Sequence, residues 1–185
     1  MTEVELRCFL DEEAYNRLKR SLVSRGVLEE DTRQITHYLG HPVDTRVQMS
    51  RDSGRVWQKL GRMHDTARQE IDAPMSRTAA ERMYEIFMNL GFQTKVSWYR
   101  HRLVFRSDGL SVALDNTVGY GRILEVEAVC EESEFRIQEA RLVELLSSLG
   151  LKASPKEDFD RAFGDYLLYW KERTAGLGPH WIDEH

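Results

Sequence analysis

Two short segments, residues 3–8 and 125–130, share the pattern Glu-Val-Glu-x-x-Cys. In a β-strand alternate side chains lie on one face, so each segment would present two carboxylates on one side and small apolar groups on the other. Carboxylate oxygens suit hard divalent cations such as Mg²⁺ and Mn²⁺. The pattern therefore predicts either a metal site shared by two strands or, as the simpler alternative, two edge strands with solvated glutamates.

Polar and apolar residues also alternate in the segments between these two copies. Residues 46–49, 55–60, 68–72 and 100–103 each place charged or polar side chains on one face. If these faces converge, the interior of a sheet contains acids and bases together. The acids would be Glu3, Glu5, Glu70, Asp115, Glu125 and Glu127, and the bases Arg7, Arg46, Lys59, Arg68, Arg100 and Arg102.

A charged interior restricts the ligands that such a sheet can bind. Ordinary small barrels fill their interior with side chains that pack together, and a buried ion that is neither paired nor bound to a ligand costs several kcal/mol. A cavity lined by both signs favours a ligand that also carries both. A metal-chelated polyphosphate meets this condition, because carboxylates bind the cation while Arg and Lys bind phosphate oxygens.

The same residues resemble the CYTH, or triphosphate tunnel metalloenzyme, superfamily, which includes class IV adenylyl cyclases, thiamine triphosphatases and inorganic tripolyphosphatases. Its N-terminal signature Glu-x-Glu-x-Lys is matched by residues 3–7, with Arg7 in place of the lysine. The likeness covers most of residues 1–150, and residues 115–127 are its most specific part. The later motif is matched by Arg100, Arg102, Leu114-Asp115, Gly119-Tyr120-Gly121 and Glu125-Val126-Glu127, and the middle strands by Arg46, Lys59-Leu60-Gly61 and Arg68-Gln69-Glu70.

The resemblance implies an α+β fold, in which an antiparallel β-barrel forms a triphosphate tunnel with a charged interior and helices packed on the outside. It also implies the role of each charged residue. Glu5, Glu127 and Arg7 are the candidate catalytic residues. The metal ligands for Mg²⁺ or Mn²⁺ would be Glu3, Glu5, Asp115, Glu125 and Glu127, and the substrate-binding residues Arg7, Arg46, Lys59, Arg68, Arg100 and Arg102.

Two positions depart from the family pattern. Arg7 replaces the motif lysine, and Gln48 stands where a second basic residue often follows Arg46. An arginine remains protonated near neutral pH, so Arg7 can bind phosphate but is a poor general base. The neutral Gln48 would change how the distal phosphate is held.

Length and composition bound the remaining possibilities. A chain of 185 residues with 41% hydrophobic residues can bury one substantial core, so we expect a single domain over residues 1–171 and a C-terminal tail over 172–185 that frays or folds locally. The net charge of −5 argues against binding duplex nucleic acid. With no signal peptide and no apolar run long enough to span a membrane, we expect a cytoplasmic protein, with a homodimer as a candidate assembly.

Four segments predict amphipathic helices, at residues 12–25, 77–90, 134–149 and 155–171. Each follows a capping residue, and the first three stop at a glycine. These helices would cover the apolar outer face of the strands. The last carries an aromatic stripe that we interpret as core packing, and residues 50–54 predict a hairpin loop. Both cysteines, Cys8 and Cys130, lie on apolar strand faces and predict buried free thiols.

Three functions remain open from the sequence. The first is metal-dependent hydrolysis of inorganic tripolyphosphate or an organic triphosphate. The second is a class IV-type adenylyl cyclase, which would convert ATP to cyclic AMP and pyrophosphate with the same metals and arginines. The third is a non-catalytic module that binds polyphosphate or a nucleotide. The histidines show no zinc-binding spacing and there is no P-loop, so phosphate binding would depend on side chains.

Overall fold

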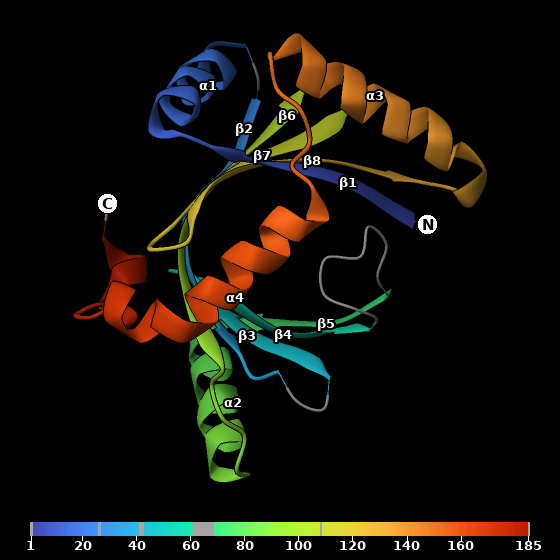
Figure 1. Cartoon of the computed structure of the whole chain (residues 1–185). Coiled ribbons are helices and arrows are strands. Elements are labelled where there is room, and N and C mark those ends of the chain that lie inside the picture. The colour runs from blue at the N-terminus through green and yellow to red at the C-terminus, as the bar shows by residue number, and fades with distance from the viewer. Residues whose placement is uncertain (1, 26, 41–42, 61–68, 108, 185) are drawn as a thin grey trace.

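The structure is a computed structural model that describes residues 2–25, 27–40, 43–60, 69–107 and 109–184, with side chains for all of these except residues 2, 3, 25, 59, 69, 70 and 107. A single antiparallel sheet of eight strands forms its centre (Figure 1). The strands are β1 (Thr2–Leu10), β2 (Val27–Tyr38), β3 (Asp44–Met49), β4 (Ser53–Leu60), β5 (Gln69–Ser76), β6 (Val96–Ser107), β7 (Leu110–Thr117) and β8 (Gly121–Cys130). Their order across the sheet is β1-β8-β7-β6-β2-β3-β4-β5.

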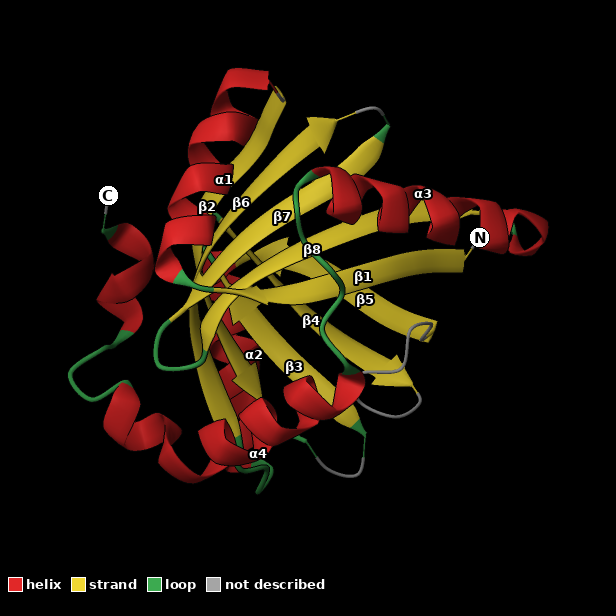
Figure 2. Ribbon diagram, turned by 45° about the horizontal axis from the view of Figure 1, so that its top comes forward, coloured by secondary structure: helices red, strands yellow, loops and turns green. Residues whose placement is uncertain are grey.

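The sheet curls so that its two halves face each other, as the fanned strands in Figure 2 show. Its outermost strands are β1 and β5, and no pairing joins them among the described residues. The predicted α+β fold, an antiparallel sheet with helices packed around it, is confirmed. The sheet is open between β1 and β5, however, so it is a curled sheet and not a closed barrel.

Four helices pack against the sheet, at the positions that the sequence predicts. They are α1 (Glu12–Arg25), α2 (Arg77–Asn89), α3 (Phe135–Ser148) and α4 (Lys156–Arg173). In Figure 1, α1 and α3 lie over the half of the sheet that contains β1, β7 and β8, whereas α2 lies under the half that contains β3 and β4. The sheet therefore has two hydrophobic cores on its convex side, one around Leu124 and Leu142 and one around Val47 and Ala80.

The last helix, α4, differs from the other three because it packs on the concave side of the sheet. The Trp98 ring of β6 stacks on Tyr166 at 4.6 Å and on Phe163 at 5.8 Å between ring centroids. The buried Tyr166 hydroxyl donates to the Ser97 carbonyl oxygen at 2.9 Å. The aromatic stripe is thus core packing, as predicted, and it closes part of the concave face instead of covering the outer one.

The turn between β7 and β8 fixes the C-terminal end of α4. Gly119 has a φ of +72°, and a Cβ atom at this position would lie 2.5 Å from Cβ of Arg173. The Arg173 guanidinium donates to the Gly119 carbonyl oxygen at 3.1 Å. Only glycine suits this backbone conformation and this close approach.

After α4 the chain folds back onto β2 in the short 3₁₀ helix η2 (Pro179–Asp183). Ile182 is buried in the same core as Ile35 and Leu39 of the β2 region. Asp183 pairs with Arg77 at the start of α2 at 2.6 Å. The tail beyond Arg173 therefore packs against β2 and α2 through both apolar and charged contacts.

Three further predictions concern single elements. The loop predicted at residues 50–54 is shorter in the structure, because β4 already begins at Ser53 and only residues 50–52 lie between the strands. The Ser50 amide donates to the Ser53 carbonyl oxygen at 2.8 Å. Cys8 and Cys130 are buried and free, as predicted. Of the helices described, none combines the length and apolar character needed to cross a bilayer.

Candidate active site on the concave face of the sheet

Strand register brings the charged residues of the two Glu-Val-Glu segments together. Pairing of β1 with β8 places Arg7 opposite Glu125 and Glu5 opposite Glu127. Pairing of β6 with β7 places Arg102 opposite Asp115. Because these residues alternate along their strands, they all lie on the concave face.

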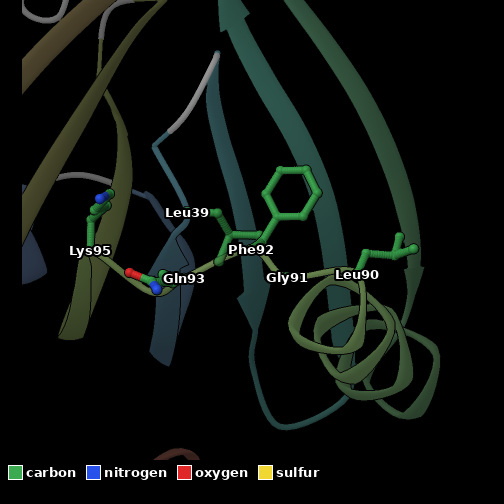
Figure 3. Close-up of a pocket in the computed structure, with 6 residues that line it drawn as sticks. All are labelled: Leu39, Leu90, Gly91, Phe92, Gln93 and Lys95. Atoms are coloured by element: carbon green, nitrogen blue, oxygen red, sulfur yellow. The ribbon is translucent and has the colours of Figure 1, made fainter.

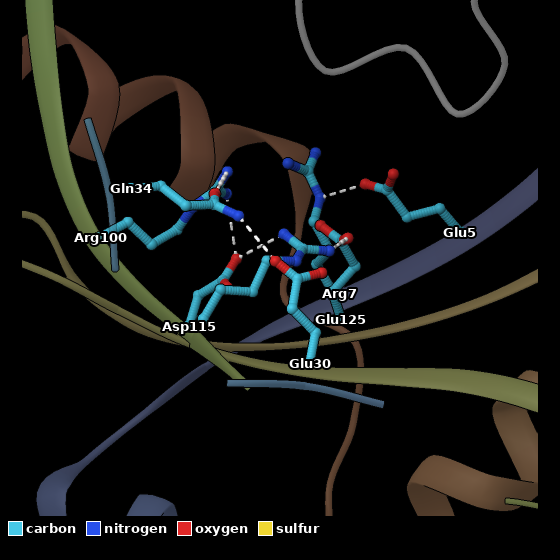
Figure 4. Close-up of polar contacts among 8 residues, drawn as sticks. Glu5, Arg7, Glu30, Gln34, Arg100, Asp115 and Glu125 are labelled. Carbon is cyan, nitrogen blue, oxygen red and sulfur yellow. Dashed lines mark hydrogen bonds and ion pairs between the residues drawn. The ribbon is translucent and has the colours of Figure 1, made fainter. Parts of the chain in front are cut away.

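Asp115 lies at the centre of this face, and two arginines bind it (Figure 4). Its Oδ2 atom accepts from Nη1 of Arg100 at 3.1 Å and from Nη1 of Arg102 at 3.0 Å. The Asp115 side chain is only 4% exposed. Its other oxygen, Oδ1, is buried and has no hydrogen-bond partner within the described part of the chain.

Glu125 lies beside this cluster and completes it. Its Oε1 atom accepts from Nη2 of Arg102 at 2.6 Å, so Arg102 bridges two carboxylates. Burial opposes ionisation of Glu125, but Arg102, Arg100 and Arg7 outweigh it and lower its pKa to about 2. Glu125 therefore remains an anion at every pH near neutrality.

Burial affects the two arginines in different ways. For Arg102 it opposes the charge, but the carboxylates of Glu125 and Asp115 outweigh it, so the pKa is raised. For Arg100 burial dominates and the pKa is lowered, with Asp115 opposing this shift and the charges of Arg102 and Arg46 adding to it. Of these two arginines, Arg100 is therefore the one whose positive charge is less compensated by neighbouring carboxylates.

At the open edge of the sheet, Glu5 and Arg7 of β1 form an ion pair with 2.7 Å between Oε1 and Nε. About a quarter of each side chain is exposed. The Arg7 guanidinium also lies 4.5 Å from the centre of the Phe159 ring of α4. The aromatic stripe of α4 therefore borders the charged face and holds one of its arginines.

The facing half of the sheet contributes Arg46 of β3. Its Nε and Nη2 atoms donate to the two carboxylate oxygens of Asp44 at 2.7 and 2.8 Å. The guanidinium lies 5.6 Å from the centre of the Tyr38 ring and 5.7 Å from that of Trp57. These contacts hold Arg46 in place by a bidentate ion pair and by two aromatic neighbours.

Three predicted site residues cannot be placed fully. Arg68 lies outside the described residues, and the side chains of Glu3 and Lys59 lie outside the described part of their strands. Backbone pairing places Lys59 opposite Asp44, and Glu3 opposite Val129. The structure brings the other predicted residues to one concave face: Glu5, Arg7, Asp115, Glu125, Glu127, Arg100 and Arg102 on one half, and Arg46 on the other.

Three residues that bind the predicted site residues, directly or through one another, were not predicted from the sequence: Glu30 and Gln34 of β2 and Asp44 of β3. The Gln34 side chain is buried, accepts from Nη2 of Arg100 at 3.2 Å and donates to Glu30 at 3.0 Å. Asp44 is the partner of Arg46. Asp44 could have been found from its spacing, since residues two apart in a strand share a face. Gln34 could not, because its strand was not recognised.

The carboxylates have the chemistry of a site for Mg²⁺ or Mn²⁺, with hard oxygen ligands and the unpartnered Oδ1 of Asp115 among them. Register places Glu5 and Glu127 side by side. Within the described residues, no three acidic, histidine or cysteine side chains gather around one point. Asp115, Glu125 and Glu5 bind arginines instead. The residues therefore fit a divalent cation by chemical type, and binding would require carboxylates to exchange an arginine for the metal.

A separate pocket lies where α2 connects to β6 (Figure 3). It has a volume of about 330 Å³ and is lined by Leu39, Leu90, Gly91, Phe92, Gln93 and Lys95. None of the predicted site residues lines it, so it forms no part of the charged face.

No family model matches the chain, and no curated protein matches it either. Solved structures do share its fold. The protein PH1012 from Pyrococcus horikoshii is 18% identical with a TM-score of 0.67, covering 83% of this chain and 95% of that one. A candidate adenylate cyclase from Vibrio parahaemolyticus is 15% identical with a TM-score of 0.63, covering 85% and 97%.

A third similar structure is HpAC1 from Hippeastrum, a candidate adenylyl cyclase with a dominant triphosphatase activity. It is 16% identical with a TM-score of 0.60, and the match covers 100% of both chains. The chain therefore shares its fold with solved structures that include candidate adenylyl cyclases, and the α+β fold expected from the motifs is confirmed.

Proposed function

We propose that the concave charged face binds a small-molecule triphosphate and hydrolyses it with the help of Mg²⁺ or Mn²⁺. The observation that carries this proposal is the pairing of Arg100 and Arg102 with one buried oxygen of Asp115. Two guanidinium groups carry more N–H donors than a single carboxylate can accept. Buried positive charge also destabilises a protein unless an anion lies beside it. A triphosphate is an anion that would use those donors.

The roles of the basic residues follow from their contacts. Arg100 retains an Nε atom without a hydrogen-bond partner among the described residues, so it can donate to a phosphate oxygen without losing Asp115. Arg7 and Arg46 are fixed by aromatic rings at the two sides of the face. With Arg102, Lys59 and Arg68, they would neutralise the charge that develops on the phosphoryl oxygens.

The acidic residues would bind the metal. Glu3, Glu5, Asp115, Glu125 and Glu127 are the candidate ligands, because carboxylate oxygens suit Mg²⁺ and Mn²⁺. When bound, such a cation lowers the pKa of a coordinated water and neutralises phosphate charge. Glu5 or Glu127 would orient the attacking water. An arginine is a poor general base, so Arg7 would orient phosphate and not remove a proton.

Hydrolysis is favoured over cyclisation for a reason of chemistry. A cyclase must hold the nucleoside so that its 3′-hydroxyl attacks, whereas hydrolysis needs only the triphosphate and a water. The residues of the charged face are all suited to phosphate or metal. That the similar Hippeastrum protein has a dominant triphosphatase activity also supports this choice.

The test is to measure phosphate release and cyclic AMP formation by the purified protein, with tripolyphosphate, thiamine triphosphate and ATP, and with Mg²⁺ and Mn²⁺ separately. We expect phosphate release and little cyclic AMP. Cyclic AMP forming faster than phosphate from ATP would overturn hydrolysis in favour of a cyclase. Tight binding of all three substrates without turnover would indicate a non-catalytic module.

Glu127→Gln provides the matched test of the metal assignment. It removes one charged ligand and keeps the side-chain volume, so we expect turnover to fall at least a hundredfold, roughly the scale of an essential group, with an unchanged melting temperature. Glu139→Gln, on the exposed surface of α3, is the control and should behave as the unmutated protein. Near-normal turnover of Glu127→Gln at saturating metal would contradict the assignment.

A further inference from the structure

Four buried polar atoms on β2, β3 and β4 lack a hydrogen-bond partner among the described residues. They are Oγ1 of Thr36, Oε1 of Gln48, Nε of Arg55 and Nε1 of Trp57. An unpaired buried polar group destabilises the folded state by about 1–3 kcal/mol. Four such groups close together would therefore lower stability considerably if nothing bound to them. Such groups commonly mark a place where a ligand or ordered water binds.

These atoms belong to one continuous strip of the concave face. Strand pairing aligns Thr36 with Gln48 and Gln48 with Arg55, and it aligns Trp57 with Arg46 in the adjacent row. Thr36 and Trp57 are each only 3% exposed. On β6, Arg100 is two residues from Trp98, which pairs with Thr36. The strip therefore lies beside the Asp115 cluster without including it.

The chemistry of the strip is that of hydrogen-bond donors beside two ion-paired arginines, Arg55 with Asp72 at 3.5 Å and Arg46 with Asp44 at 2.7 Å. The Arg55 Nε and the Trp57 indole nitrogen can only donate, and the Thr36 hydroxyl can donate. The Gln48 amide can present its NH₂ group by rotating through 180°, since oxygen and nitrogen of an amide are assigned from their partners. Donors arranged in this way fit an oxyanion.

Aromatic stacking gives no support for a ring-shaped ligand here. Guanidinium groups already lie over the Trp57 ring, with Arg55 at 4.1 Å and Arg46 at 5.7 Å from its centre. These contacts hold both guanidinium groups in place beside the unpartnered donors. A phosphoryl group fits the strip better than a base does.

We propose that Thr36, Gln48, Arg55 and Trp57 form a second oxyanion subsite, which binds a terminal phosphoryl group of the same triphosphate that Arg100 and Arg102 hold. This inference rests on the proposed function. It assigns a role to the neutral Gln48, whose amide replaces a cation as a donor. It also makes Arg55 and Trp57 substrate-binding residues.

The test compares two isosteric substitutions of buried threonines in titration calorimetry with tripolyphosphate, which measures binding and not turnover. Thr36→Val removes the proposed donor. Thr45→Val is the matched control, because Thr45 is 4% exposed on the opposite face of β3 and its hydroxyl accepts from Gln58. We expect Thr36→Val to weaken binding roughly threefold to tenfold, the scale of one hydrogen bond, and Thr45→Val to leave affinity unchanged.

Thermal melting without ligand supplies a second readout. Thr36→Val replaces an unpaired hydroxyl by a methyl group, so its melting temperature should equal or exceed that of the unmutated protein, whereas Thr45→Val breaks a hydrogen bond and should melt lower. Arg55→Gln should weaken tripolyphosphate binding at least tenfold, the scale of a charge-assisted hydrogen bond.

Two outcomes overturn different claims. Unchanged affinity in both Thr36→Val and Arg55→Gln, with normal binding by the unmutated protein, would eliminate the second subsite alone. Failure of the unmutated protein to bind tripolyphosphate at all, with or without Mg²⁺, would instead overturn the proposed function.

Discussion

Asp115 and Arg102 explain how a charged interior can persist in the folded protein. Each positive group of the cluster has a carboxylate within 3.1 Å, and Arg102 has two. Buried ions that are paired in this way cost far less than isolated ones, although pairing rarely adds net stability. The pairs therefore keep the charged groups in place within the fold, which suits the binding role that we propose for them.

Residue spacing predicted most of this cluster but not all of it. Asp115, Glu125 and Arg102 alternate on strands with a clear polar face, so their convergence follows from the period of the strand. The ion pairs themselves could not be predicted, because they depend on which strands are neighbours. Gln34 reaches Arg100 only because β2 pairs with β6, a contact between residues 66 apart in the chain.

Glu125→Gln should lower stability in a pH-dependent way. The folded protein lowers the pKa of Glu125 from 4.5 to about 2, so the ionised form stabilises the fold above pH 4.5 and this stabilisation is lost as the pH falls towards 2. This lowering of the pKa corresponds to roughly 3 kcal/mol of stability at neutral pH. Chemical denaturation of both proteins at several pH values would measure this, and a stability difference that stays constant down to pH 2 would contradict it.

Arg102→Ala and Arg100→Ala should differ in their effect on the free protein. Removing Arg102 leaves Glu125 and one side of Asp115 without a partner and should cost roughly 3–5 kcal/mol. Removing Arg100 relieves a cation whose pKa burial already lowers, so its cost should be much smaller. Urea denaturation measures both, and calorimetry should show triphosphate binding weakened by about 1.5–3 kcal/mol in each. Equal losses of stability would mean that Arg102 does not bridge the carboxylates.

Whole elements were predicted unevenly. All four helices follow from caps, glycine stops and apolar stripes, and they begin and end within two residues of the prediction. The strand β2 was not predicted, because a register shift between Leu28 and Glu30 breaks its alternation. Its buried residues also include the consecutive Gln34, Ile35 and Thr36, which no half-exposed strand would show. Tertiary packing on both faces therefore hid the pattern.

The helix α4 shows how an element can satisfy its sequence pattern and still occupy an unexpected place. Its aromatic stripe needs an apolar partner, and Trp98, Tyr38 and Phe9 offer one on the concave face. Pattern alone indicates that the stripe is buried but does not say against which side of the sheet. The consequence for function is that Phe159 contacts Arg7, so this helix shapes the site.

Tyr166→Phe should loosen the contact of α4 with the sheet. The substitution removes the hydroxyl that donates to the Ser97 carbonyl oxygen and leaves a buried acceptor with one partner fewer. We expect a loss of about 1–2 kcal/mol in the free energy of unfolding. Tyr169→Phe, on an exposed part of the same helix, is the control and should change little. A loss no larger than that of the control would show that stacking alone fixes α4.

At the scale of the whole molecule, the open sheet carries paired charged residues on both of its facing halves. One half carries the Asp115 cluster and the other carries Arg46, whose charge still lowers the pKa of Arg100. The hydrophobic cores lie on the convex side of each half. A ligand bound on the concave face would contact both halves and so stabilise the molecule as a unit.

This arrangement predicts that metal and triphosphate stabilise the protein together and not separately. In the free protein Glu5, Asp115 and Glu125 bind arginines, so Mg²⁺ alone must compete with those pairs and should raise the melting temperature by less than ~1 °C, well below 1 kcal/mol of stabilisation. A triphosphate occupies the arginines and frees the carboxylates for the cation. At 100 times its dissociation constant, Mg²⁺-tripolyphosphate should contribute about 2.7 kcal/mol of stabilisation, which raises the melting temperature by roughly 5–11 °C for a domain of this size.

Differential scanning fluorimetry with each ligand alone and with both would measure these shifts in melting temperature, using Ca²⁺-free buffer and EDTA as the metal-free reference. A full shift with Mg²⁺ alone would mean that the carboxylates already form a metal centre before the substrate binds.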